Sequence, residues 1–103
     1  MKTSELTGAA LDWAVAKAWQ PEYSDKHLLE HIKGFQPSTN WCIGGPIIEL
    51  MGMHISRTNK TDKEPWAACM TNWIDGATPL EAAMRCYAAY RLGDQVDIPE
   101  ELR

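Results

Sequence analysis

The sequence predicts an α+β fold, a small α/β sandwich in which an antiparallel β-hairpin or sheet packs against about three helices. Apolar residues recur at helical spacing near both ends of the chain, whereas the middle alternates apolar and polar residues with a period of two. Strong capping signals precede the last helical segment. The 103 residues fit one domain spanning residues 1–103, with an acidic tail from about residue 94.

Residues 7–18 are predicted to form the first helix. Thr7 is a natural N-cap, because its hydroxyl can accept a hydrogen bond from a free N–H group of the first turn, and Pro21 ends the segment. The apolar residues at helical spacing predict a buried stripe, which consists of Leu11, Ala14, Val15 and Ala18. Asp12 and Lys17 are expected to face water.

Residues 22–36 allow two interpretations. The first is a short helix capped by Ser24, with Gly34 as its C-terminal stop, and the second is an irregular or partly extended segment. His27 and His31 lie four residues apart, and the letters HLLEH match the inverted zinc motif HxxEH formally. The chain offers no credible third ligand, so we expect surface histidines and no bound metal.

Residues 37–49, "PSTNWCIGGPIIE", also allow two interpretations. In one, a helix of residues 41–52 is capped by one of three consecutive polar residues, Ser38, Thr39 and Asn40. In the other, Gly45 caps a helix that begins at Pro46. The first places Pro46 inside a helix, which costs about 3 kcal/mol, and it therefore requires a compensating tertiary contact.

The sheet is predicted from the middle of the chain. Residues 53–59 and 65–74 each alternate with period two, and the polar residues 59–64 are predicted to form the turn of an antiparallel hairpin. The last helix is predicted over residues 78–92, where Thr78 is the N-cap and Glu81 completes a capping box.

Composition excludes several classes of protein. The net charge is −4, and the one local basic group is Arg57, Lys60 and Lys63 at a predicted turn, so binding of duplex nucleic acid is not expected. The cysteines are odd in number and scattered along the chain, and they are Cys42, Cys69 and Cys86. This pattern predicts buried free thiols in a reducing cytosol. No apolar run approaches 18 residues and no signal peptide is recognisable, so we expect a soluble, cytoplasmic protein without a membrane segment. No cofactor is predicted.

A candidate ligand site centres on residues 38–45. Free backbone N–H groups near Ser38–Asn40 or at Gly44 and Gly45 would form a cradle for a carboxylate or phosphate. Trp41 would stack on a base, and Arg85 or Arg57 would supply positive charge. The alternative is plain architecture, in which the polar residues only cap a helix, Trp41 fills the core and the glycines permit close packing against the last helix.

Three stretches, "ELTGAALDWAVAKA", "PSTNWCIGGPIIE" and "GATPLEAAMRCYAAYRLGDQVDIPEEL", resemble the phage NinX-like family of small proteins of unknown function. The resemblance spans about two thirds of the chain, and the family is in turn similar to small phage α/β/α sandwich domains. Asn40 stands where the family pattern carries Asp. The resemblance implies a phage or prophage origin and a fold, and it assigns no catalytic residues.

Three classes of function are weighed. No Ser/His/Asp, Cys/His or paired-carboxylate arrangement is recognisable, so we do not expect an enzyme. The favoured hypothesis is a homo-oligomeric phage accessory protein of the bacterial host's cytoplasm that counters host defence by sequestering a small nucleotide-like signalling molecule. The alternative is a protein-interaction module that inhibits or redirects a host protein.

Overall fold

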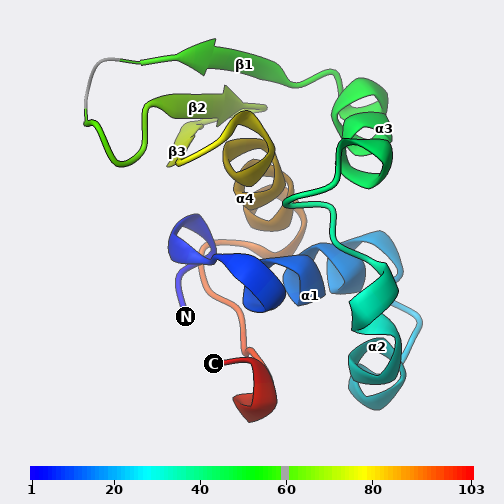
Figure 1. The fold of residues 1–103 in the computed structure, drawn as a ribbon. Coiled ribbons are helices and arrows are strands. Elements are labelled where there is room, and N and C mark those ends of the chain that lie inside the picture. The colour runs from blue at the N-terminus through cyan, green and yellow to red at the C-terminus, as the bar shows by residue number, and fades with distance from the viewer. Residues whose placement is uncertain (59–60) are drawn as a thin grey trace.

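The computed structural model describes residues 1–58 and 61–103, and it confirms the predicted α+β class (Figure 1). The α-helices are α1 (Gly8–Trp19), α2 (Asp25–His31), α3 (Trp41–Met51) and α4 (Pro79–Leu92). The strands are β1 (His54–Arg57), β2 (Trp66–Cys69) and β3 (Trp73–Gly76). Short 3-10 turns are η1 (Thr3–Glu5), η2 (Ile32–Gly34) and η3 (Glu100–Leu102). Part of the predicted hairpin turn, residues 59–60, lies outside the described residues.

Helix α4 is the central layer of the molecule. The three antiparallel strands, in the order β1-β2-β3, lie on one side of α4, and α1 packs against another side of it (Figure 1). The row Ile55, Ala68 and Ile74 runs across the three strands and belongs to the apolar core. Gly76 lets the helix approach closely, because a Cβ there would lie 2.4 Å from the backbone nitrogen of Ala82.

The single predicted strand over residues 65–74 is wrong. The chain reverses after β2, and Trp73 of β3 pairs with Cys69 of β2 in an antiparallel ladder. Residues 66–70 are all apolar and residues 73–74 are apolar again, which is why the segment was interpreted as one continuous strand. Thr71 and Asn72 were the available signal, because Asn favours turns by bonding its side chain to nearby backbone.

Residues 22–36 adopt the helical alternative of the two interpretations. The Ser24 hydroxyl accepts a hydrogen bond from the His27 N–H at 3.1 Å, as an N-cap should. After α2 the chain tightens into η2, which ends at Gly34. Figure 1 shows α2 beside α1, and Leu28 is the side chain of α2 that joins the core.

Helix α3 follows the first interpretation of residues 37–49, with Pro46 inside it. The Asn40 Oδ1 accepts from the Cys42 N–H at 2.9 Å and so caps the helix. This start places Gly44 against Pro37 and Leu80, and it brings Ile47 to 2% exposure in the core. These contacts offset the cost of a proline inside the helix. Pro46 has no N–H to donate to the Cys42 carbonyl, and because Cys42 is exposed this carbonyl can bond to water instead.

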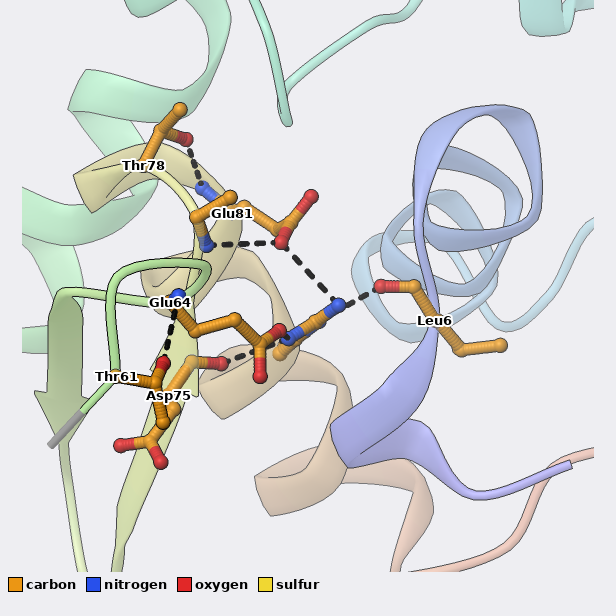
Figure 2. A network of polar contacts seen from close by, with 8 residues as sticks. Leu6, Thr61, Glu64, Asp75, Thr78 and Glu81 are labelled. Carbon is orange, nitrogen blue, oxygen red and sulfur yellow. Dashed lines mark hydrogen bonds and ion pairs between the residues drawn. The ribbon is translucent and has the colours of Figure 1, made fainter.

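Buried Arg85 of α4 binds four separate parts of the chain (Figure 2). Its Nε donates to the Leu6 carbonyl at 2.7 Å, and its Nη1 donates to the Asp75 carbonyl at 2.8 Å. Nη1 also pairs with Glu64, and Nη2 pairs with Glu81 at 3.2 Å. A single guanidinium therefore joins the segment before α1, the β1–β2 connection, β3 and α4 itself.

The two ends of the chain lie together. The Val96 N–H donates to the Met1 carbonyl at 2.9 Å, and Lys2 forms an isolated antiparallel bridge with Gln95. Ile98 is 2% exposed and anchors the acidic tail in the core. The bridge holds the start of the chain, before η1, against the residues that follow α4.

Gly44→Ala and Gly45→Ala provide a matched test of the α3 packing. A Cβ at Gly44 would lie 2.4 Å from the Pro37 carbonyl oxygen and 2.6 Å from Leu80, whereas at Gly45 the nearest atom is 3.9 Å away on Trp41. We expect Gly44→Ala to lower the free energy of unfolding by about 1–3 kcal/mol through overpacking. Gly45→Ala should raise it by about 0.5–1 kcal/mol through helix propensity. Urea denaturation measures both, and equal effects would contradict the packing described.

Arg85→Met should lower the free energy of unfolding by about 3–5 kcal/mol, because the substitution strips partners from a buried polar cluster. Arg85→Lys should be intermediate, because one ammonium group cannot reproduce the planar fork that reaches four partners. Arg91→Met is the control on the same helix, since Arg91 is exposed and its hydrogen bond and cation–π contact within the described residues are both with Tyr87. Denaturant unfolding measures these changes. An equal loss of unfolding free energy in Arg91→Met and Arg85→Met would contradict the role given to Arg85.

Candidate functional site: a pocket where three helices begin

A pocket of about 260 Å³ lies where α1, α3 and α4 begin. Its lining residues come from the start of each helix and from the segment that leads into α3, and they are Gly8, Ser38, Thr39, Trp41, Thr78, Leu80 and Glu81. Helix N-termini carry partial positive charge, so the pocket is suited to an anionic group. Three elements far apart in the sequence thus form one concave site.

Helix α1 begins at the pocket without a side-chain cap. Thr7 occupies the N-cap position with extended backbone, but its hydroxyl makes no capping hydrogen bond. By contrast Asn40 caps α3, and Thr78 caps α4 by accepting from the Glu81 N–H at 3.0 Å. Within the described residues, the first-turn N–H groups of α1 therefore remain free to bind an external acceptor.

Ser38 holds the floor of the pocket against α1. Its backbone N–H donates to Asp12 Oδ1 at 2.9 Å, and the residue is 5% exposed. The buried Ser38 hydroxyl has no hydrogen-bond partner within the described ranges, 1–58 and 61–103. The hydroxyl lies near the Asp12 carboxylate and helps to lower the pKa of that group, but without a hydrogen bond of good geometry it can turn toward a ligand in the pocket.

Trp41 stands at the rim of the pocket with 56% of its surface exposed. It occupies the first position of α3, and beneath its ring lies Gly45, where an added Cβ would touch it at 3.9 Å. The side chain therefore does not fill the core, which is the position of Trp13 at 2% exposure. An exposed tryptophan beside a polar pocket provides a flat apolar surface for stacking.

Glu81 brings one carboxylate to the pocket. Its Oε1 accepts from the Ala77 N–H at 3.0 Å and pairs with Nη2 of Arg85 at 3.2 Å. The positive charge of Arg85 offsets the charge of this carboxylate, which lowers the repulsion that an incoming anion would meet. Thr78 and Thr39 add hydroxyl groups that can donate to the same ligand.

The structure brings together only part of the predicted site. Ser38, Thr39 and Trp41 line the pocket, whereas Asn40 is engaged in capping. Gly44 is buried against Leu80 and permits close packing against the last helix. This is the role that the architectural alternative gave to the glycines.

Gly45 lies beneath Trp41, outside the lining, and Arg57 stacks over Trp66 in the sheet, 5.6 Å from the ring centroid. Arg85 is 3% exposed and its guanidinium is engaged by the four partners above, so Arg85 is not part of the proposed site.

Gly8, Thr78, Leu80 and Glu81 are pocket residues that sequence reasoning did not include. The capping box of Thr78 and Glu81 was recognised, but a one-dimensional pattern cannot show that it faces the segment before Trp41. Gly8 has a positive φ of 55°, and its place directly after a predicted N-cap was the available signal.

The cysteines differ from one another in exposure. Cys42 is exposed, which corrects the expectation of buried thiols, because it lies on the outer side of the first turn of α3. Cys86 is buried, and burial raises the pKa of its thiol.

Among the described residues no group of three metal-ligating side chains comes together, and the His27 and His31 rings stack on one another at 4.4 Å.

Comparison with known protein families matches residues 2–91 to the model described as Bacteriophage P22, NinX. The chain belongs to the phage P22 NinX family. The family match confirms a phage accessory protein and covers α1 to α4, including every residue that lines the pocket. A search of curated proteins found no match. Within the described part of this NinX-family chain, none of the helices has the length and apolar character needed to cross a bilayer.

Asp12 was expected to face water, but it lies buried in α1 at 5% exposure. The sequence pattern missed it because the partner, Ser38, is 26 residues away. Burial raises the pKa of the Asp12 carboxyl, and the Ser38 hydroxyl and the Ser38 backbone N–H, which both face the carboxylate, oppose part of that rise. Asp12 thus fixes the pocket floor while carrying a desolvation penalty.

Asp12→Asn and Asp12→Ala separate these two effects. A raised folded-state pKa means that folding binds protons, so the contribution of Asp12 to stability falls as pH rises from the ordinary carboxyl value to the raised one. Asp12→Asn keeps an acceptor for Ser38 and should be at least as stable as the parent at pH 7, an advantage that shrinks at pH 4. Asp12→Ala should lose about 1–3 kcal/mol of stability, because the buried Ser38 N–H loses its acceptor. Chemical denaturation at several pH values measures this, and an Asn variant as unstable as the Ala variant would refute it.

Proposed function

We propose that this phage protein binds and sequesters a small nucleotide-like molecule at the pocket where α1, α3 and α4 begin, and thereby counters a host defence signal. The observation that carries the proposal is the uncapped start of α1 beside the buried Ser38 hydroxyl, which makes no hydrogen bond of good geometry within the described residues. Backbone N–H groups and hydroxyls of this kind hold phosphate oxygens without requiring a lysine. A molecule that only captures its ligand needs no catalytic residues.

The dimensions and the rim support a ligand with two unlike ends. The pocket of about 260 Å³ is smaller than the ~300–1,000 Å³ typical of sites for drug-sized molecules. A phosphate or ribose-phosphate group would fit inside, and the base would remain at the rim on Trp41, where stacking contributes about 1–3 kcal/mol per base. Glu81, already paired with Arg85, stays compatible with this arrangement.

A second candidate is a protein-interaction module that acts on a host protein. Trp73 is 52% exposed on the face of the sheet opposite α4, in a row with His54 and Cys69. Exposed tryptophans are enriched at protein interfaces. The same surface is a candidate contact for the homo-oligomer proposed above.

Trp41→Ala and Trp73→Ala form a matched pair, because the two side chains are 56% and 52% exposed. If the pocket binds nucleotides, a ligand at 100 times its Kd stabilises the protein by about 2.7 kcal/mol, which raises the Tm of a chain this size by roughly 10–20 °C. We expect Trp41→Ala and Ser38→Ala to reduce that shift and Trp73→Ala to retain it. Differential scanning fluorimetry with a panel of mono-, di- and cyclic nucleotides tests this.

Absence of any shift across the panel would reject nucleotide binding. Loss of a co-purifying host protein in Trp73→Ala alone would favour the interaction module. Unchanged Tm values of the unliganded variants are the control for folding, since both tryptophans are exposed.

A further inference from the structure

We propose that a second pocket, between the C-terminal end of α1 and α2, binds a neutral planar heteroaromatic ring. The pocket has a volume of about 210 Å³ and does not share a residue with the site at the helix N-termini. Its walls carry five aromatic or imidazole side chains, which are Trp19, Tyr23, His27, His31 and Phe35. This site is independent of the function proposed above.

The aromatic walls are held in place by contacts with neighbouring rings, both inside and outside the pocket. The Trp19 ring lies 6.0 Å from the ring of Tyr87 on α4, and Tyr87 in turn accepts a hydrogen bond from Arg91. Tyr23 and His27 have their ring centroids 4.4 Å apart. Because the rings already pack against one another, a flat ligand meets preorganised surfaces and loses little side-chain entropy on binding.

The pocket favours a neutral ligand. Its lining contains no Asp, Glu, Lys or Arg. Lys17 and Asp25, on the two helices that flank the pocket, pair with each other at 2.9 Å. The floor is apolar and consists of Ala16, Leu28 and Ile32. Cationic ligands, which aromatic cages also accept, lack the carboxylate that would draw them in.

Two polar groups select a heteroaromatic ring over a hydrocarbon. His31 Nδ1 lies 2.8 Å from the His27 carbonyl oxygen, and since a carbonyl only accepts, the geometry assigns the proton to Nδ1. In the neutral ring Nε2 is then an acceptor that can receive a ligand N–H. The Gln20 carboxamide offers both a donor and an acceptor at the wall.

The volume limits the ligand to one small ring system. The pocket has a volume of about 210 Å³ and is partly open to solvent. That space suits a purine-sized ring and is below the ~300 Å³ at which sites for larger ligands begin. A free nucleobase has the flat faces and the edge of donors and acceptors that this lining matches.

Adenine titrated into the ¹⁵N-labelled full-length chain tests the inference by NMR. We expect chemical-shift changes of the amides of Gln20, Tyr23 and His31 that saturate with adenine. Tyr23→Leu should weaken binding by about fivefold or more, the loss of one stacking surface. Tyr90→Leu is the matched control, since Tyr23 and Tyr90 are 41% and 52% exposed and Tyr90 lies outside this pocket.

Each other result overturns the inference in a distinct way. Shifts confined to Ser38, Thr39 and Trp41 would assign the base to the first pocket and leave the second without a ligand. Equal weakening by Tyr23→Leu and Tyr90→Leu would show nonspecific stacking. Absence of shifts up to the solubility limit of adenine would reject the site. Inorganic phosphate, which should shift the first pocket and not the second, reports on the proposed function separately.

Discussion

The fold depends on the guanidinium of Arg85. Burial of an unpaired charge is unfavourable by several kcal/mol, so a buried arginine remains only where its donors are matched. Here the matches are the Leu6 and Asp75 carbonyls and the Glu64 and Glu81 carboxylates, which belong to four different segments. Because each segment must be in place for the charge to be satisfied, the network couples the sheet, α4 and the entry to α1. Figure 2 also shows Thr61 bonded to the Glu64 backbone, which orders the loop that carries one carboxylate.

Around that polar centre, small residues set the distance between layers. Ala68, Ala82 and Ala83 are fully buried, and Gly76 sits where a methyl group would meet the backbone of α4. Gly44 plays the same role between α3 and Leu80. A core made of small side chains brings backbones together, and dispersion contacts then accumulate along their length. This explains how a short chain can keep much of its tryptophan surface outside the core, at Trp19, Trp41 and Trp73.

The sequence predicted the elements better than the contacts between them. Helix α1 followed from periodicity, and α4 followed from capping and periodicity, since Thr78 and Glu81 interact within one turn. Helix α3 was one of two interpretations that the sequence left open. Asp12 was misplaced because a periodic pattern places a carboxylate at the surface, and its partner Ser38 is distant in the chain. The turn before β3 was missed because only two polar residues, Thr71 and Asn72, separate the apolar residues of β2 from those of β3. For the candidate site, three of seven predicted residues, Ser38, Thr39 and Trp41, line the pocket, while Arg85 matched the chemistry of a ligand residue but belongs to the core.

Helix α1 connects the two pockets and keeps them apart. Its first residue, Gly8, lines one pocket, and its last, Trp19, lines the other. Twelve residues of α-helix span about 18 Å, which exceeds the length of a single nucleobase, so one such ring cannot occupy both. Between the ends, Asp12 ties the helix to Ser38, while Leu11, Val15 and Ala14 lie fully buried in the core. A helix fixed along its middle transmits little displacement from one end to the other, because close-packed cores resist gradual deformation. The geometry therefore makes the two pockets separable by mutation, and a ligand at one end of α1 should leave affinity at the other end unchanged.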